Sequence, residues 1–164
     1  MSKTEKNLKE AFAGESQANR RYLAFAKRAE DENLAGIAQL FRAAAAAETI
    51  HAHKHLATMK GVRSTKDNLE EAIAGETHEF KTMYPQMIAD AKEEGNKSAE
   101  ISFSYANEVE KVHAQLYQNA LEQMDKFPVS SYYICNVCGY TAANAPPDKC
   151  PVCGANQKAF FKVE

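Results

Sequence analysis

The chain has 164 residues, of which 26% are charged and 45% are hydrophobic, and its formal net charge at pH 7 is -2. Because neither sign of charge dominates, the composition argues against a general nucleic-acid binder or membrane-surface binder. The length is sufficient for one substantial hydrophobic core together with a small additional domain.

The N-terminal residues 1–6 lead directly into a charged helical pattern, without the apolar segment of a secretory signal peptide. The sequence also contains no run of about 18 apolar residues, which is the length needed to span a bilayer. We therefore expect a cytoplasmic protein with neither a membrane segment nor a nucleic-acid partner.

Four long stretches have apolar residues at the helical spacing i, i+3, i+4 and i+7. They predict helices at roughly 3–30, 34–60, 66–93 and 97–126. Asn33, Gly61 and Gly95 supply breaks between them, and Pro85 is expected to bend the third helix because it lacks a backbone N–H. The connections are short, so consecutive helices are expected to be antiparallel neighbours unless the middle connection opens.

The helical part contains an internal repeat of two helices. Residues 7–15 and 68–76 are identical at seven of nine positions, with an offset of 61 residues. A Glu-x-x-His pair follows in each copy, at residues 48–51 and 110–113, with an offset of 62 residues. The duplication predicts a bundle with approximate two-fold symmetry, in which two acidic sets meet at the centre.

These glutamates and histidines lie on the apolar rows of their helices. A carboxylate buried there without a partner would cost on the order of several kcal/mol, and residues three apart on a helix are neighbours. One Glu-x-x-His pair alone is common on solvated helix faces, but two pairs in register with a repeat indicate bound cations. The pattern is that of ferritin-like di-iron and di-manganese proteins, and mixed oxygen and nitrogen ligands suit iron or manganese. We therefore predict an all-α four-helix ferritin-like bundle with the metal ligands Glu15, Glu48, His51, Glu76, Glu110 and His113.

Three further residues are candidates for a role near these ligands. Tyr22 and Tyr84 lie seven and eight residues after the glutamates of the first and third helices. Each is interpreted either as a core residue or as a neighbour of the metal ligands. Glu79 lies three residues after Glu76, where the first copy has Ala18. The sequence leaves open whether Glu79 is an additional ligand or an exposed surface residue.

The character of the chain changes near residue 128, where helical periodicity stops and the cysteines begin, so the predicted domains are residues 1–128 and 129–164. Two Cys-x-x-Cys-Gly segments contain Cys135, Cys138, Cys150 and Cys153, with eleven residues between Cys138 and Cys150. Four such thiolates predict a tetrahedral site for zinc or iron, because a reducing cytoplasm disfavours disulfides. A domain this small needs the ion in order to fold. Zinc would leave a structural ribbon, whereas iron would give a one-electron carrier.

Over its whole length the sequence resembles the rubrerythrins, in which a ferritin-like diiron bundle precedes a rubredoxin-like domain with a four-cysteine iron site. The resemblance is carried by the glutamates and histidines named above, by Met83-Tyr84-Pro85 and by both cysteine segments. It implies two non-haem iron ions in the bundle and one rubredoxin-type iron, with zinc as a substitute at either site. It also implies a peroxidase, an oxidoreductase that reduces hydrogen peroxide to water and protects against oxidative stress.

The resemblance further implies roles for single residues and for partners. The implied roles are bridging ligands Glu48 and Glu110, terminal ligands Glu15 and Glu76, a fixed ligand His113, and a redox-dependent exchange of one iron between Glu79 and His51. The rubredoxin-type iron would relay electrons from a redox partner protein that draws on NAD(P)H. The expected assembly is a head-to-tail homodimer, in which the rubredoxin-type iron of one subunit serves the bundle of its partner. Helix-swapped and tetrameric forms stay open.

Two other functions stay open on the sequence alone. A ferritin-like ferroxidase or iron-handling protein would form a hollow shell of many subunits, whereas the peroxidase would be a dimer or tetramer, so the native mass distinguishes them. A helical bundle with a structural zinc ribbon would be colourless, whereas a ferric four-thiolate site is red.

Overall fold

The computed structural model describes residues 1–163 of the chain. Its helices are α1 (Lys3–Asp31), α2 (Ala35–Thr58), α3 (Thr65–His78), α4 (Tyr84–Glu93) and α5 (Lys97–Gln123). A π-helical turn, Glu79–Met83, joins α3 directly to α4. These two segments together form the third of the four predicted helices. The four helices are thereby confirmed, with ends close to the expected residues.

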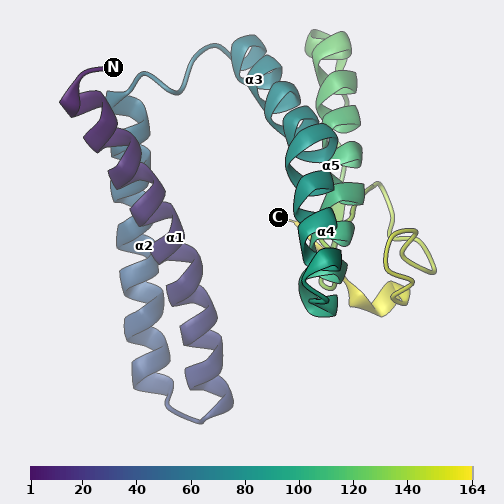
Figure 1. Cartoon of the computed structure of the whole chain (residues 1–164), viewed down its shortest axis with the longest axis horizontal. Helices are drawn as coiled ribbons and strands as arrows, with labels where there is room; N and C mark the ends of the chain where they lie inside the picture. The colour runs from purple at the N-terminus through teal and green to yellow at the C-terminus, as the bar shows by residue number, and fades with distance from the viewer. Residues whose placement is uncertain (164) are drawn as a thin grey trace. The chain divides into compact units, whose positions relative to one another are not determined.

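The chain divides into two compact units, and the first of them, Met1–Arg63, is a hairpin of α1 and α2 (Figure 1). Asn33 has φ 59° in the turn between the helices, a left-handed conformation that asparagine tolerates better than most residues. The Asn19 side-chain amide donates to the Ala45 carbonyl at 2.7 Å and to Thr49 Oγ1 at 2.8 Å. These bonds link the two helices near their middle.

Every buried residue of α1 and α2 is an alanine, a small side chain that allows two helices to approach each other. The buried residues are Ala26 and Ala29 on α1 and Ala38, Ala45 and Ala52 on α2. Larger apolar side chains of α2 are exposed, among them Ile37, Leu40 and Ile50. The hairpin therefore presents apolar side chains that its own two helices do not cover.

In the second unit, Ser64–Glu164, the continuous helix formed by α3, the π turn and α4 packs beside α5 (Figure 1). The Tyr84 N–H donates to the Glu79 carbonyl five residues earlier, instead of the usual four. Pro85 follows at the start of α4, where a residue without an N–H is best tolerated. The helix thus accommodates the proline with a wide turn at the position where the sequence predicts a bend.

The C-terminal part of the second unit is a small antiparallel sheet. Its strands are β1 (Tyr132–Cys135), β2 (Thr141–Ala143) and β3 (Phe160–Lys162), in the order β2-β1-β3. Ile134 of β1 pairs with Thr141 of β2, and the Tyr140 and Phe160 rings meet edge to face with centroids 6.4 Å apart. β2 lies against α5, so the sheet is fixed relative to that helix.

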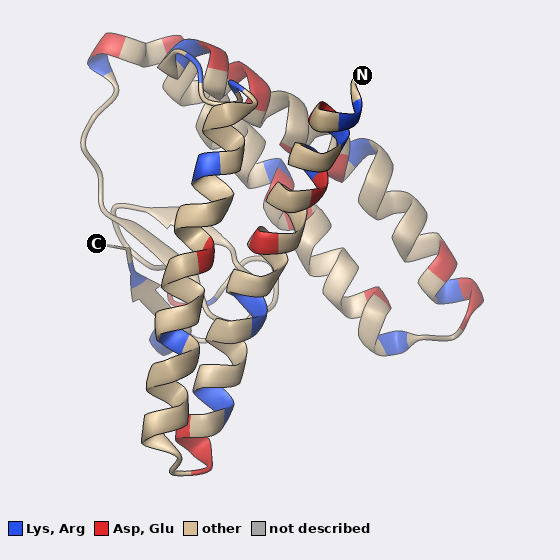
Figure 2. Cartoon of the chain, turned by 90° about the vertical axis from the view of Figure 1, so that its left-hand side faces the viewer, with Lys and Arg blue, Asp and Glu red and all other residues tan. Residues whose placement is uncertain are grey.

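Charged residues of both signs are interspersed along the helices (Figure 2), in keeping with the net charge of -2. Within residues 1–163, no helix combines the length and the apolar character needed to cross a membrane. The boundary expected near residue 128 lies between a 3-10 turn, Met124–Lys126, and β1. The division into residues 1–128 and 129–164 stays a prediction.

Candidate metal centres

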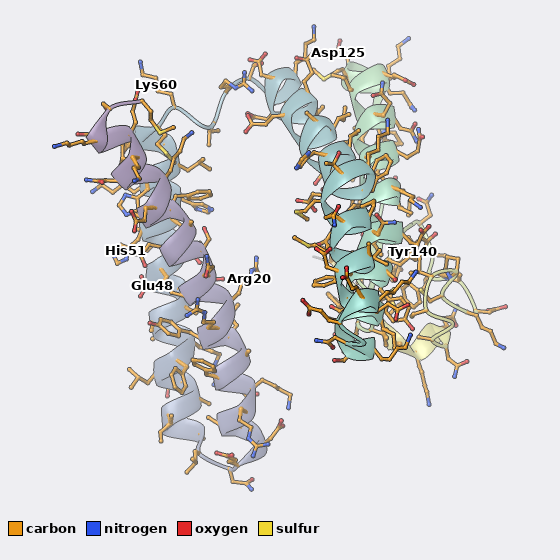
Figure 3. The ribbon with its side chains drawn as sticks, viewed as in Figure 1. Arg20, Glu48, His51, Lys60, Asp125 and Tyr140 are labelled. Atoms are coloured by element: carbon orange, nitrogen blue, oxygen red, sulfur yellow. The ribbon has the colours of Figure 1, made fainter. Side chains whose placement is uncertain are left out.

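α1 and α2 bring together three predicted ligands, Glu15, Glu48 and His51, which we call the first carboxylate–histidine set. One ligand atom from each lies within 4.8 Å of the other two. His51 Nδ1 lies 2.8 Å from Glu48 Oε2, as a spacing of three residues on one helix permits, and both are labelled on α2 in Figure 3. The His51 side chain is 55% exposed, compared with 19% for Glu48. The histidine is therefore the open side of this set.

α3 and α5 bring together the other three ligands, Glu76, Glu110 and His113, which we call the second carboxylate–histidine set. His113 Nδ1 lies 2.7 Å from Glu110 Oε2 and 3.8 Å from Glu76 Oε1. The His113 side chain is only 28% exposed. The sequence repeat is thus repeated in the geometry: each helix pair combines a Glu-x-x-His pair with one glutamate from the neighbouring helix.

Burial and the proximity of the carboxylates in the second set raise the pKa of Glu76. Burial is the largest cause that raises the pKa of Glu76 from 4.5 to about 7, followed by the charge of Glu110, a hydrogen bond with it, and the charge of Glu79. Two adjacent carboxylates cannot both ionise easily, so one of them holds a proton near neutral pH. A divalent cation would displace this proton and remove the repulsion. The electrostatics of the set therefore fit a metal-binding role.

Glu79 and Tyr84 lie at the second set. Glu79 begins the π turn, and its charge contributes to the raised pKa of Glu76, so the two carboxylates are near each other. Burial raises the pKa of Tyr84, and the charges of the three neighbouring glutamates, Glu110 first, raise it further. The tyrosine therefore keeps its proton at neutral pH and can donate a hydrogen bond.

The rings of both tyrosines contact a phenylalanine of the neighbouring helix, Tyr22 at 6.3 Å from Phe41 and Tyr84 at 6.3 Å from Phe103, measured between ring centroids. The Tyr22 ring also lies 6.3 Å from that of Phe25. This aromatic cluster joins α1 to α2, which corresponds to the core alternative for Tyr22. The geometry thus groups the six ligands into two sets of three, while the role of each residue in the site stays a prediction.

A contact that the sequence does not predict joins the second set to the C-terminal sheet. His113 Nε2 lies 2.9 Å from Oγ1 of Thr141, the first residue of β2. The Thr141 hydroxyl in turn donates to the Gly139 carbonyl at 3.4 Å. Thr141 stands only three residues after Cys138. No pattern identifies it, because helical periodicity does not say which residue of a small sheet docks on a helix.

The four cysteines converge as their spacing predicts. All four Sγ atoms lie within 4.8 Å of one another, with Cys135 to Cys153 at 3.7 Å and Cys138 to Cys150 at 3.5 Å. A tetrahedron with metal–sulfur bonds of about 2.3 Å has sulfur–sulfur edges of about 3.8 Å. The geometry therefore fits one tetrahedral ion.

Backbone geometry at the two knuckles supports this site. Gly139 has φ 84° and Gly154 has φ 76°, a region that glycine enters without strain. Burial raises the pKa of Cys150, but N–H groups of the backbone and the Cys138 thiol outweigh burial and bring the pKa down to about 7. Burial also raises the pKa of Cys138. A cation would hold all four sulfurs as thiolates.

The protein thus combines two sets of glutamate and histidine ligands on helices with four cysteines on two knuckles. This combination defines an iron-binding protein with a ferritin-like part and a rubredoxin-like part. The rubrerythrin family model matches residues 6–121, and the model of the rubrerythrin rubredoxin-like domain matches residues 133–161. The chain therefore belongs to the rubrerythrin family.

Relatives with this organisation cover nearly the whole chain. Rubrerythrin-2 of Clostridium acetobutylicum is 38% identical and covers 93% of this chain and 92% of its own length. Nigerythrin of Nitratidesulfovibrio vulgaris is 36% identical and covers 96% of this chain and 85% of its own length. Solved nigerythrin structures in a mixed-valence state and in a fully reduced, all-ferrous state have a TM-score of 0.60, with 35% and 34% identity over 99% of this chain and 88% of theirs.

These matches confirm the resemblance to the rubrerythrins. Together with the helices and the four clustered cysteines, they also confirm the fold class, an all-α four-helix ferritin-like protein with a small rubredoxin-like four-cysteine domain. The ligand groups and the family support iron binding.

Proposed function

We propose that the protein is a non-haem diiron peroxidase that reduces hydrogen peroxide to water. Each H₂O₂ takes up two electrons and two protons and yields two waters. The proposal is carried by one observation: the second carboxylate–histidine set is hydrogen-bonded through His113 to the domain that holds the four cysteines. A metal site joined to an electron carrier suits a redox enzyme better than iron storage or a structural zinc ribbon.

The ligands suit two iron ions in the helical site and one in the four-cysteine site. The two sets together offer four carboxylates and two imidazoles, which would balance two divalent ions. Bound iron would supply electrons, and a pair of ions can hold both oxygens of the substrate. As the family resemblance implies, Glu48 and Glu110 would be shared by the two ions, Glu15 and Glu76 would each hold one ion, and His51 and His113 would supply the imidazole ligands.

Glu79 and Tyr84 are proposed to manage charge and protons around this site. Glu79 begins a π turn, an irregularity that often occurs at functional sites. We propose that its carboxylate and the His51 imidazole would each be able to hold the same ion, in different redox states. The Tyr84 hydroxyl, whose pKa is raised, stays protonated at neutral pH and can donate a hydrogen bond to an oxygen of the bound substrate.

The four-cysteine domain is proposed to return electrons to the helical site. A four-thiolate iron carries one electron at a time, so two successive transfers serve each peroxide. The electrons would come from a separate redox partner protein that draws on NAD(P)H.

We further propose that the active form is a homodimer, in which the first set of one subunit meets the second set of the other. A ferritin-like bundle has one long crossover connection, which returns the chain to the end where the preceding helix began. Here α2 ends at Thr58 and α3 begins at Thr65. Seven residue-to-residue steps reach at most about 25 Å.

The positions of the glutamates determine the distance that this connection would have to cross. Glu48 lies ten residues before the end of α2, and Glu76 lies eleven residues after the start of α3. Suppose that α2 and α3 ran parallel in one bundle, with Glu48 and Glu76 at the same height. With a rise of about 1.5 Å per residue, the end of α2 would then lie roughly 30 Å from the start of α3. The connection is too short, so a ferritin-like site would combine hairpins from two copies. The exposed Ile37, Leu40 and Ile50 offer apolar area for that packing.

Metal analysis combined with a peroxide assay tests the proposed function. We expect iron at both kinds of site, the red colour of a ferric four-thiolate centre, and rapid oxidation of the reduced protein by stoichiometric peroxide. Sustained turnover should follow when NADH and an electron-transferring reductase are added. Protein that mineralises iron but leaves peroxide untouched would favour the ferroxidase, and colourless zinc protein would favour the ribbon.

Subunit mixing tests the assembly. Glu48→Ala damages the first set and Glu110→Ala damages the second. In a hairpin-exchanged dimer, a mixed dimer of these variants regains one intact site, so an equal mixture should recover about a quarter of the wild-type activity. Glu48→Ala mixed with Glu15→Ala is the matched control, because both changes damage the first set and no intact site can form. Equal failure of both mixtures would show that each bundle closes within one chain.

A further inference from the structure

Thr141 is a residue of the four-cysteine domain that contacts the helical ligand set, through Oγ1 at 2.9 Å from His113 Nε2. We propose that Thr141 is a positioning residue, which holds His113 with its proton on Nε2 and leaves Nδ1 as the atom that binds metal. The inference rests on the proposed function and extends it to a residue outside the ligand sets.

The hydrogen bonds of the Thr141 hydroxyl determine where the imidazole proton lies. A hydroxyl has one hydrogen to donate and accepts through its oxygen, whereas a carbonyl only accepts. Because the hydroxyl donates to the Gly139 carbonyl, Oγ1 is left as an acceptor toward His113. The hydrogen in the His113–Thr141 bond therefore belongs to Nε2, and in a neutral imidazole Nδ1 keeps its lone pair.

The free lone pair on Nδ1 faces the carboxylates of the same set. Nδ1 lies 2.7 Å from Glu110 Oε2 and 3.8 Å from Glu76 Oε1. The Nδ1 lone pair and one oxygen of each glutamate lie within 4.8 Å of one another, so all three can bind one cation. Metal-binding histidines commonly donate their other N–H to an oxygen that fixes the orientation of the ring. Thr141 provides that oxygen from a different domain.

Two further contacts keep Thr141 in register with His113. Thr141 pairs with Ile134 in the β1–β2 ladder, so its backbone is held by the sheet. Gly139 lies against α5, because a Cβ on this glycine would stand 4.0 Å from Cγ1 of Val109, four residues before His113. The first cysteine knuckle therefore follows α5 over one helical turn, and the threonine hydroxyl is presented to the imidazole from a fixed position.

This contact also gives a short route between the two kinds of metal site within one chain. The route leaves the Cys138 thiolate, follows three residues of backbone to Thr141, and crosses one hydrogen bond to His113. It runs beside a largely apolar cavity of about 400 Å³, where a hydrogen bond is stronger than in water.

Nitrogen-15 NMR of the full-length protein loaded with zinc tests the assignment, because zinc is diamagnetic and accepts imidazole ligands. Long-range proton–nitrogen correlations report which ring nitrogen of each histidine carries hydrogen. We expect the hydrogen of His113 on Nε2 and zinc on Nδ1. Hydrogen on Nδ1 with zinc on Nε2 would overturn the proposal without any substitution.

Variants at Thr141 test its role. Thr141→Val keeps the β-branched shape but removes the hydroxyl, so zinc affinity at the second set should fall about 10- to 100-fold in chelator competition. The Nε2 hydrogen of His113 should also exchange faster with water. Thr141→Ser keeps the hydroxyl and should restore both properties. Asn156→Ala is the matched control, because Asn156 stands three residues after Cys153, on the other knuckle. Unchanged zinc affinity in Thr141→Val would contradict the proposal.

Peroxide turnover separates this inference from the proposed function. Wild-type protein with the expected imidazole tautomer but no peroxide turnover would refute the function and leave the role of Thr141 intact. Wild-type protein that turns over peroxide with the opposite tautomer would refute the role of Thr141 alone. If Thr141→Val does not fold, the wild-type spectrum and the Thr141→Ser comparison still decide the question.

Discussion

The two carboxylate–histidine sets follow one sequence pattern but differ in what surrounds them. In the first set, Glu15, Glu48 and His51 lie on two helices packed through alanines, and the histidine is more than half exposed. In the second set, a π turn adds Glu79, and the C-terminal sheet holds the far side of the imidazole. Local spacing creates a ligand set, and the neighbours of that set give it its particular chemistry.

Because their surroundings differ, His51 and His113 are expected to have different roles as ligands. His113 is held at Nε2 by Thr141, and its Nδ1 lies 2.7 Å from Glu110 Oε2, so its ring is fixed for permanent ligation. His51 is the more exposed of the two, so it can leave or rejoin an ion at lower cost. An exchange between His51 and Glu79 would therefore take place on the more open imidazole.

The largest expected effect comes from removing one carboxylate from either set. Glu110→Ala and Glu48→Ala should each lower peroxide turnover on the order of 10³-fold or more, as loss of a central electrostatic group does. The absorption of the four-thiolate iron should stay unchanged in both. Glu108→Ala is the control, because Glu108 is exposed on α5 and pairs with Lys111. Retained turnover in Glu110→Ala would count heavily against the helical site as the reactive centre.

The second-largest effect is expected from a substitution in the four-cysteine site, and it tests whether that site and the helical sets have separate roles. Cys138→Ser should reduce steady-state turnover to background, because a serine oxygen is a poor ligand for a site selected by soft thiolates. The pre-reduced variant should still complete one reaction with peroxide. Stopped-flow oxidation of the reduced protein measures that single turnover, and its loss would mean that the cysteine domain also supports the helical site structurally.

A smaller effect is expected from the asymmetric glutamate. Glu79→Ala should lower turnover about tenfold, the lower end of the range for a residue that supports a metal site. Glu79→Gln, which keeps the size but removes the charge, tells whether the carboxylate itself is needed. Ala18→Glu places a glutamate at the equivalent position of the first set. It should not compensate, because α1 has no π turn there.

The smallest effect concerns the metal-free protein and its pH dependence. The pKa of Glu76 rises to about 7 in the folded state from 4.5, so between these values the folded state binds more protons than the unfolded state. The contribution of Glu76 to stability is therefore fully present below pH 4.5 and is lost as pH rises through about 7. Melting temperatures at pH 5 and pH 7.5 measure this loss as a few degrees at most.

Glu76→Gln is the control for this pH effect, because glutamine does not titrate. The difference in melting temperature between wild type and Glu76→Gln should move against the wild type as the pH rises. Added zinc should abolish the trend, since the cation replaces the proton. A pH-independent difference would mean that Glu76 does not share a proton with its neighbours.

Much of this organisation was predictable because it depends on short spacings. The Glu-x-x-His pairs lie on helices with 3.6 residues per turn, so Glu48 with His51 and Glu110 with His113 had to be neighbours. The Cys-x-x-Cys-Gly segments likewise form knuckles that direct their sulfurs to one point. The four helices and the resemblance to the rubrerythrins were predicted from the same patterns and are confirmed.

Other features could not be predicted because they depend on packing between distant segments. The bend expected at Pro85 is a π turn, since the helix can widen and keep most of its hydrogen bonds. Periodicity marked Tyr22 and Tyr84 alike, and each ring contacts a phenylalanine of the neighbouring helix, but the pKa of Tyr84 is also raised by burial and by three nearby glutamates. The contact of Thr141 with His113 spans 28 residues and has no local signature.

The sequence by itself determined which residues are candidate metal ligands, how they are grouped on helices and knuckles, and which family the chain resembles. These properties depend on covalent order and helical period, which act over a few residues. The tertiary structure decided the asymmetry between the two sets: the π turn at Glu79, the raised pKa of Glu76, and the threonine that holds His113. These features depend on which segments pack against each other and exclude water, and only the folded chain determines that packing.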